Sequence, residues 1–472
     1  MQRPRSSFPN ILWIVLEDVS PEFGCYDGPD AVRTPNIDRL AAEGATFTDA
    51  YATNPMCSPS RSALATGMYQ TTLGAHHQRV HQDEDEPTGP NPLPDGVRVI
   101  SDRLRDADYR TANLTAFPGS MDLDVVGKLD WNFDYHGEPF DTNAWADLRD
   151  ASPFFAQIST YEVHRGEYWN SAHERIPEPA EPEDVELPPY LPDHPVVRED
   201  FAQYYNTIMA ADQTVGQVID GLEAEGWLEE TVVVLMADHG RPMVRDKQHP
   251  YDSGLNVPLV IRWPDAYESP PQYESGTVDE RLVSTIDVTA TTLSVAGVEP
   301  PDEMHGRPFY GDGADDPRDY VFGAVDRIAE VPERRRTVRS KRFRYVRNYM
   351  PGTPWLPMNR YLQASRDIPW VLRSLDEAGE LDAVQAQYLS ETKPPEELYD
   401  TQEDPHQVDN LADSLDHREL LDEMRRVLDD WERRTDDQGR FPEYPEVVEF
   451  YRDRKAATFD ELIAERREEW GL

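Results

Sequence analysis

Apolar runs alternate with amphipathic stretches over the first three hundred residues of the chain. Residues 11–16, 153–159, 231–237 and 257–263 are short runs dominated by apolar and β-branched side chains, which predict buried strands. Residues 199–226 place apolar side chains at nearly helical spacing, which predicts a long amphipathic helix. Because unalternating strands separated by helices are typical of sheets covered on both faces, the pattern predicts an α/β fold built on a mostly parallel sheet.

The pattern changes after about residue 310. Residues 318–325 and 336–349 predict strands of a small antiparallel sheet, and two charged helical segments follow near the C-terminus. We therefore expect two domains. The first is an α/β domain that carries the functional site over residues 1–310, and the second is a smaller subdomain over residues 311–472 with an antiparallel sheet and terminal helices.

With 91 Asp and Glu against 46 Lys and Arg, the chain carries a formal net charge of −45. The acidic residues are spread along the sequence, which argues against a disordered acidic tail. An evenly acidic, lysine-poor surface is expected of a protein adapted to very high salt, where screening suppresses self-repulsion; the alternative is an ordinary acidic protein. No basic stripe is present, so we expect no nucleic-acid partner. The five lysines are Lys128, Lys247, Lys341, Lys393 and Lys455.

The chain has two cysteines, Cys25 and Cys57, too few for a disulfide scaffold or a thiolate zinc site. It contains no apolar stretch near the about 20 residues that a membrane span needs. The apolar run at residues 11–16 is too short for a signal-peptide core and ends in Glu17 and Asp18. We expect a cytoplasmic protein without a membrane partner.

Polar residues with metal-ligating atoms follow two of the predicted strands. Glu17 and Asp18 follow the first strand, and Asp238 and His239 follow residues 231–237. Because the carboxyl ends of parallel strands meet at one edge of a sheet, where the sites of such folds form, we expect these side chains to lie together. Carboxylates gathered there need a cation between them, and oxygen ligands suit Ca²⁺ or Mg²⁺.

A third segment, "NPMCSPSRSALATG" at residues 54–67, places Cys57 just before an expected helix that opens near Pro59. The free N–H groups at the start of a helix favour an anion. A divalent cation and a helix start that face one point are typical of sites for phosphate or sulfate esters. Each piece alone is common in unrelated loops, so the prediction rests on their combination.

The pentapeptide "CSPSR" at residues 57–61, followed by "SALATG", resembles the Cys-x-Pro-x-Arg signature of type I sulfatases, a family of the alkaline phosphatase superfamily. Residues 16–61 are similar to the opening of that family almost continuously, and residues 237–264 are similar to a later block. Residues 336–412 resemble in particular the heparan N-sulfatase (sulfamidase) branch. The resemblance covers nearly the whole chain and implies an alkaline-phosphatase-like core.

In this family the signature cysteine is oxidised by a formylglycine-generating enzyme, and the hydrated aldehyde replaces the thiol as nucleophile. The resemblance implies this change at Cys57, because a sulfated thiol would have no clean route for the release of sulfate. It also implies one bound divalent cation, with Ca²⁺ expected and Mg²⁺ as the alternative. The implied metal ligands are Glu17, Asp18, Cys57, Asp238 and His239. The implied catalytic residues are Cys57, Arg61, Lys128, His164 and Lys247.

The resemblance gives the catalytic residues separate roles. Arg61 lies one helical turn beyond Cys57 and would hold the formylglycine. Lys128 and Lys247 would grip sulfate oxygens. His164 would hydrogen-bond sulfate and help to protonate the leaving group.

Three positions depart from the family pattern. Glu17 stands where an aspartate is usual, and Val163 replaces the proline before His164. Asp130 stands where the Gly-Lys-x-His block has a histidine that supports the formylglycine hydroxyls. Either Asp130 takes that role differently or another residue serves. The other candidates, which would also line a substrate pocket, are His76, His77 and His81.

These observations predict a metal-dependent sulfatase that hydrolyses a sulfate ester or an N-sulfate of a small substrate such as a sulfated sugar. Two alternatives stay open. The first is a phosphodiester or phosphonate monoester hydrolase of the same superfamily. The second is a non-catalytic anion-binding protein in which Cys57 remains a thiol.

Overall fold

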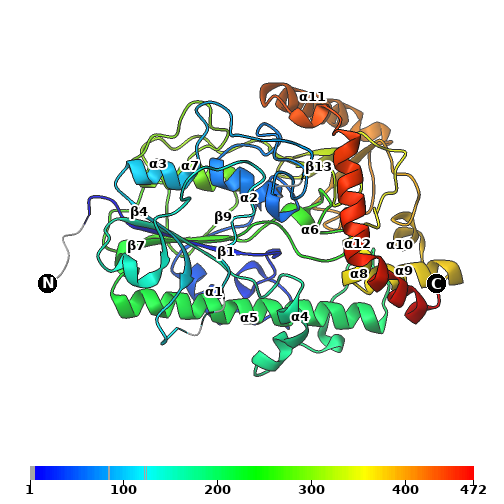
Figure 1. The fold of residues 1–472 in the computed structure, drawn as a ribbon, viewed down its shortest axis with the longest axis horizontal. Coiled ribbons are helices and arrows are strands. Elements are labelled where there is room, and N and C mark those ends of the chain that lie inside the picture. The colour runs from blue at the N-terminus through cyan, green and yellow to red at the C-terminus, as the bar shows by residue number, and fades with distance from the viewer. Residues whose placement is uncertain (1–5, 83–85, 122, 124) are drawn as a thin grey trace.

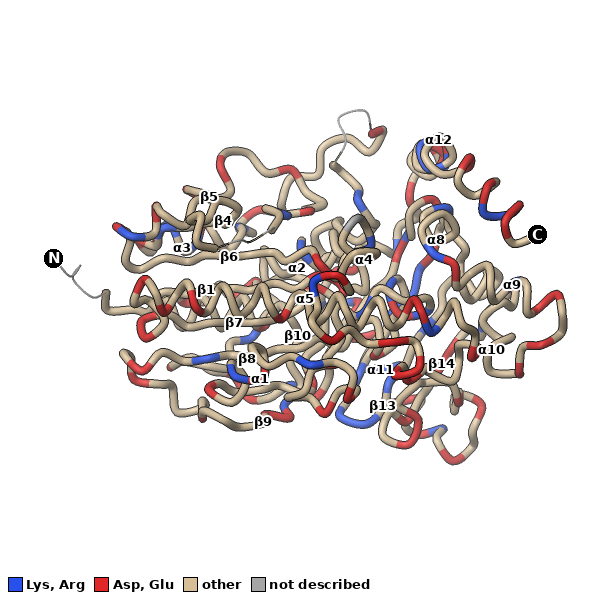
Figure 2. Tube along the Cα trace, turned by 90° about the horizontal axis from the view of Figure 1, so that it is seen from below, with Lys and Arg blue, Asp and Glu red and all other residues tan. Residues whose placement is uncertain are grey.

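The central sheet has eight strands in the computed structural model, which describes residues 6–82, 86–121, 123 and 125–472. These strands are β1 (Asn10–Leu16), β2 (Ala45–Phe47), β4 (Arg110–Ala116), β5 (Thr142–Ala144), β6 (Phe154–Ser159), β7 (Thr231–Ala237), β8 (Leu259–Arg262) and β9 (Thr277–Asp279). Their order is β5-β4-β6-β1-β7-β8-β2-β9 (Figure 2). β1 is parallel to β6 and β7, whereas β8 is antiparallel to β7. The predicted fold class is therefore confirmed.

Helices cover both faces of this sheet (Figure 1). α1 (Pro35–Ala42) and α5 (Pro195–Glu225) lie on one face. The other face carries α2 (Cys57–Thr66), α3 (Ile100–Asp106) and α7 (Thr285–Val295). The helix predicted at residues 199–226 is α5, and it begins earlier because Pro195 suits a first helical turn. The ring nitrogen Nδ1 of His194 caps that turn by accepting from the N–H of Val196 at 3.2 Å.

A second sheet lies in the C-terminal part, where the sequence predicted a small antiparallel sheet. It consists of β11 (Val321–Val325), β12 (Arg335–Arg339), β13 (Phe343–Asn348) and β14 (Glu396–Asp400) in that order, with each pair antiparallel. α11 (Arg418–Arg434) packs on it through Leu421, Met424 and Leu428. The proposed domain boundary at residue 310 falls between α7 and β11.

The remaining elements connect these layers. They are β3 (Ala50–Tyr51), β10 (Val283–Ser284), α4 (Glu167–Ser171), α6 (Asp252–Leu255), α8 (Arg360–Ser365), α9 (Ile368–Ala378), α10 (Ala383–Gln387) and α12 (Pro445–Trp470). Figure 1 shows α12 crossing the end of the molecule beside α8, with the C-terminus below it. No helix among the described residues is both long and apolar enough to cross a membrane. Asp and Glu are distributed over all parts of the drawn chain (Figure 2).

The two innermost strands fix the position of the functional edge. Every residue of β1 and β7 is buried, as expected for strands covered on both faces. The two strands pair in parallel register from Asn10 opposite Thr231 to Leu16 opposite Ala237. The residues that follow Leu16 and Ala237 therefore leave the sheet side by side.

Candidate active site

The ends of β1 and β7 bring four polar side chains together, as the sequence predicts. Glu17, Asp18, Asp238 and His239 are all buried. Asp18 has a left-handed backbone conformation with φ of 58°, and its N–H donates to Oδ1 of Asp238 at 3.2 Å. This backbone turn joins the two strand ends into one structural unit.

Cys57 is the first residue of α2, so the helix start faces this edge of the sheet. Its Sγ lies 3.3 Å from Nε2 of His239 and 3.9 Å from Oδ1 of Asp18. All ten residues of α2 are buried, which holds the helix start rigidly in place. Met56 precedes the helix in an extended conformation, with no side-chain cap on the first N–H groups. The helix start can therefore face an anion, as the sequence predicts.

Asp18, Cys57 and His239 form a compact group whose ligand atoms all lie within 4.8 Å of one another. Nδ1 of His239 donates to the carbonyl of Gly240 at 2.9 Å, which directs Nε2 toward Asp18 and Cys57. Burial alone would lower the pKa of His239, but Asp238 and Asp18 raise it to about 10. The surroundings therefore favour positive charge at this point, and the donor set fits the divalent cation that the sequence predicts.

Glu17 is placed differently from the other predicted ligands. Its Oε1 accepts from Nη2 of Arg61 at 3.2 Å, and its Oε2 accepts from Nζ of Lys128 at 3.0 Å. Oδ2 of Asp238 likewise accepts from Nε of Arg61 at 2.9 Å. Both carboxylates thus adjoin the compact group while holding cationic side chains. Metal ligation by Glu17 and Asp238 stays a prediction.

Arg61 ties the two strand ends to the helix, as its position one turn after Cys57 suggests. Its guanidinium bridges Glu17 and Asp238, and Nη1 also donates to Oγ of Ser159 at 3.1 Å. The side chain is buried, and the neighbouring carboxylates keep its pKa above the usual value despite the cost of burial. Arg61 therefore orients Asp238 and braces the start of α2.

Two of the remaining predicted catalytic residues, His164 and Lys247, line one cavity of about 90 Å³ together with Cys57. Nζ of Lys247 lies 3.5 Å from Sγ of Cys57. The same ammonium donates to both oxygens of Asp18, at 2.7 and 2.8 Å. Lys128 reaches the site through its contact with Glu17.

His164 follows β6 in a turn and stacks on the ring of Tyr161, with centroids 4.9 Å apart. Burial lowers its pKa to about 3; Asp18 opposes that shift, whereas Lys247 adds to it. The imidazole is therefore neutral at ordinary pH. Nδ1 is buried and has no hydrogen-bond partner among the described residues, so it is available to a bound ligand.

The structure gives Asp130 a different use from that of the expected histidine. Its Oδ1 lies 3.7 Å from Nε of Arg79, and its Oδ2 lies 3.7 Å from Nζ of Lys128. Burial would raise its pKa, but Lys128 and Arg79 hold the pKa below its usual value. Asp130 is thus an anionic anchor for two cations.

The three histidines proposed as substitutes lie elsewhere, because none is among the described residues that line the cavity. Nδ1 of His77 accepts from the N–H of Arg327, and Nδ1 of His81 donates to the carbonyl of Gly89. His76 is buried, and its ring lies 4.3 Å from that of His77 at an angle of 47°. Two neighbours in the same segment, Gln78 and Arg79, do line the cavity, so a role for the histidines themselves at the substrate stays a prediction.

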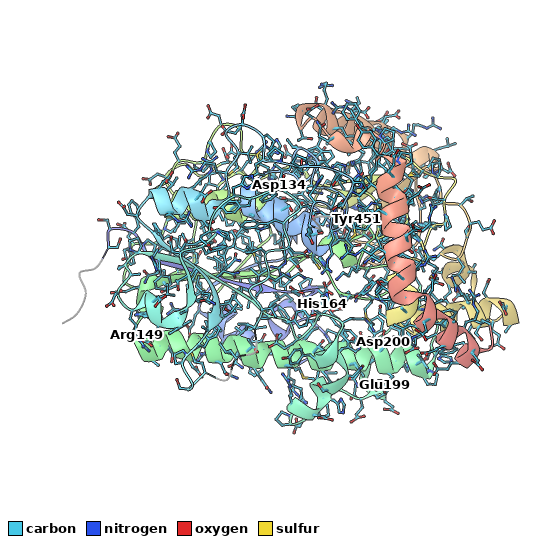
Figure 3. The ribbon with its side chains drawn as sticks, viewed as in Figure 1. Asp134, Arg149, His164, Glu199, Asp200 and Tyr451 are labelled. Carbon is cyan, nitrogen blue, oxygen red and sulfur yellow. The ribbon has the colours of Figure 1, made fainter. Side chains whose placement is uncertain are left out.

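Six further residues line the cavity that the sequence analysis did not assign to it. They are Gln78, Arg79, Ala329, Tyr361, Tyr451 and Lys455. Figure 3 shows His164 near the end of the central strands and Tyr451 on α12, and both line the cavity. None of the six belongs to a recognisable motif, although the scarcity of lysine could have singled out Lys455.

The chain matches the family model described as sulfatase over residues 9–298. A second model, described as N-sulphoglucosamine sulphohydrolase, C-terminal, matches residues 240–358. The chain belongs to the sulfatase family. Its resemblance to the sulfatases and to their sulfamidase branch is therefore confirmed, and it is a sulfuric ester hydrolase by family.

Known relatives and a solved structure agree with this assignment. An ulvan-active sulfatase of Formosa agariphila is 33% identical over 92% of this chain and 76% of the relative. The N-sulphoglucosamine sulphohydrolase of Homo sapiens is 27% identical over 92% of this chain and 91% of the relative. A structure solved in complex with its substrate D-glucosamine-2-N,6-O-disulfate matches with a TM-score of 0.61 at 17% identity, covering 91% of this chain and 99% of that one. This last likeness shows a shared fold.

Proposed function

We propose that this sulfatase removes sulfate from a sugar, either as an O-sulfate ester or as an N-sulfate, with residue 57 in the formylglycine form. The observation that carries the proposal is Cys57 at the start of α2, in contact with His239 and Lys247 inside one cavity. The names of the relatives, an ulvan-active sulfatase and an N-sulphoglucosamine sulphohydrolase, support a sulfated sugar as substrate.

The proposed cation is held by Asp18, His239 and the oxidised Cys57, with Asp238 beside them. Ca²⁺ suits this irregular set because its coordination is flexible, whereas Mg²⁺ demands nearly octahedral geometry. When bound, the ion supplies Lewis acidity toward oxygen atoms of the substrate and of residue 57. Glu17 accepts one contact on each oxygen, from Arg61 and Lys128, and keeps lone pairs with which it can join the ligands.

The formylglycine hydrate, made by a formylglycine-generating enzyme, supplies one hydroxyl to attack sulfur and a second through which sulfate is released. Residues of this chain would bind the sulfate and accept the proton in this reaction. Lys247 contacts both Asp18 and Cys57. With a cation bound to Asp18, its ammonium would donate to a sulfate oxygen instead of to that carboxylate. Asp238, oriented by Arg61, would accept the proton of the attacking hydroxyl.

The function is tested by comparing 4-nitrophenyl sulfate with an aryl phosphonate monoester, using protein produced together with a formylglycine-generating enzyme. We expect a higher kcat/KM for the sulfate, because Lys247 and His164 beside residue 57 suit a sulfate group. Chelation by EDTA should abolish turnover, and Ca²⁺ should restore it better than Mg²⁺. Preference for the phosphonate would contradict the proposal, and binding without turnover of either ester would favour an anion-binding protein.

His164 gives a second test, because a bound sulfate anion would favour the protonated imidazole that can donate a proton to the leaving group. A sugar alcohol or amine needs protonation to depart, whereas 4-nitrophenolate does not. We expect His164→Gln to lower kcat/KM for a sulfated sugar by about 10²- to 10⁴-fold and to affect 4-nitrophenyl sulfate far less. His136→Gln, at an exposed position, is the matched control. Equal losses on both substrates would show that His164 does not act on the leaving group.

A further inference from the structure

Lys455 lines the active-site cavity, but the proposed reaction assigns no role to this cation. Of the five lysines, Lys341 pairs with Asp49 at 2.8 Å and Lys393 pairs with Glu333 at 2.8 Å. Lys455 lines the cavity from α12 and makes no ion pair with any described residue. In a chain with a net charge of −45, an unpaired lysine beside the catalytic cysteine is unusual.

The carboxylate of Glu330 lies near Lys455 but is directed to another partner. Its Oε1 accepts from the backbone N–H of Arg360 at 2.8 Å and lies 3.7 Å from Nη1 of the same residue. Neither contact involves Lys455, so its ammonium at the cavity wall is open to an anionic ligand.

Arg79 supplies a second cation at the same wall of the cavity. Its side chain is 53% exposed, and its Nε stands 3.7 Å from Asp130, too far for a direct hydrogen bond. The hydroxyl of Tyr451, one helical turn before Lys455 on α12, donates to the carbonyl of Arg79. This contact joins the loop of Arg79 to the helix of Lys455, so the two cations border the cavity together.

The size of the cavity determines which part of a substrate reaches these cations. About 90 Å³ accommodates a sulfate group, whereas pockets for whole drug-sized ligands measure about 300 to 1,000 Å³. With the scissile sulfate against Cys57 and Lys247, the rest of the molecule would contact the other lining residues, which include Arg79 and Lys455. A neutral sugar alone would leave Lys455 without an anionic partner and Arg79 with only the contact to Asp130.

We infer that Arg79 and Lys455 bind a second anionic group of the substrate, a sulfate or a carboxylate, while the first sulfate lies at residue 57. The inference rests on the proposed function and narrows its substrate class to sugars that carry at least two negative groups. Asp130 is the positioning residue of this subsite, because its carboxylate lies 3.7 Å from Nε of Arg79, which lines the cavity. The replacement of the expected histidine thereby gains a physical reason.

Binding to the Cys57→Ala protein tests the inference without hydrolysis. Calorimetry would compare glucosamine N-sulfate with two doubly charged probes: glucosamine 2-N,6-O-disulfate and an N-sulfated glucosamine linked to a uronic acid. We expect at least one doubly charged probe to bind about 10-fold tighter than the singly charged one. The tighter probe shows whether the second group is a sulfate or a carboxylate.

Substitution then assigns the effect to its residues. In the same Cys57→Ala background, Lys455→Gln and Arg79→Gln should each bring the affinity ratio close to 1 and leave binding of glucosamine N-sulfate within about 2-fold. Lys341→Gln removes a lysine of the same chain at a distant ion pair and should leave the ratio unchanged. Because Lys455 has no ion pair to lose, its variant is expected to fold normally.

The outcomes separate this inference from the proposed function. Equal affinity for all three probes, or a ratio unchanged in both variants, would overturn the second anion subsite. Suppose that the Cys57→Ala protein binds a doubly charged probe more tightly than glucosamine N-sulfate, and that Lys455→Gln and Arg79→Gln both remove this preference. That result would support the subsite, even if the protein with Cys57 hydrolysed no sulfate. Hydrolysis of 4-nitrophenyl sulfate with a ratio of 1 would leave the sulfatase proposal standing and refute the subsite alone.

Discussion

Replacing Cys57 by alanine is expected to lower kcat/KM for an aryl sulfate by about 10⁴-fold or more, because the nucleophile is lost. Cys57 is buried at the start of α2, and no other cysteine, serine or threonine of the described residues lines the cavity. The measurement is the initial rate of protein produced together with a formylglycine-generating enzyme. Mass spectrometry of the peptide that contains residue 57 should show an aldehyde in the active parent protein.

Cys25 provides the matched control, since it is the only other cysteine of the chain. It is half-buried, its backbone N–H donates to Asp38, and burial raises the pKa of its thiol to about 12. Cys25→Ala should therefore leave the rate within about 2-fold. An unmodified thiol at residue 57 in fully active protein would contradict the proposed mechanism.

Replacing Arg61 by methionine is expected to destabilise the fold by about 3 to 5 kcal/mol, because it leaves two buried carboxylates without their cation. The guanidinium contacts Glu17 at 3.2 Å and Asp238 at 2.9 Å, and both acids are buried. Methionine preserves much of the apolar stem, so the loss reports on the charge. Urea denaturation in the presence of EDTA measures the free energy of unfolding without compensation by a metal ion.

Arg149→Met is the control for this experiment. Arg149 pairs with Glu225 at the surface, with its side chain 51% exposed, and an exposed ion pair contributes about 1 kcal/mol or less. Arg61→Lys should recover part of the loss, since it keeps the charge without the two-sided bridge. Equal destabilisation by Arg61→Met and Arg149→Met would show that Arg61 is not the counter-ion of the strand ends.

Local patterns predicted the part of the site that depends on strand ends. Unbroken apolar runs identified β1 and β7, and the polar residues directly after them had to share one edge of a parallel sheet. The signature cysteine and Arg61 lie one turn apart on α2, so their relation also follows from local geometry. These elements are determined by short-range sequence, and the structure places them as expected.

The wall of the cavity could not be predicted in the same way. Tyr361 and Lys455 lie far along the chain from Cys57, and they reach it only because α8 and α12 pack against each other. α12 spans Pro445–Trp470 and is the last of the two charged helical segments predicted near the C-terminus. The strand at residues 257–263 was identified, but its antiparallel pairing with β7 depends on chain reversal through the loop that precedes it.

The burial of Cys57 bears on whether its proposed oxidation comes before or after folding. Its side chain is 4% exposed, and the whole of α2 is covered by the surrounding layers. A large enzyme has little access to this thiol in the folded chain, so the proposed conversion would take place on an unfolded or nascent segment. Molecules that fold before that conversion would keep the thiol, and the active fraction of a preparation would then be decided during synthesis.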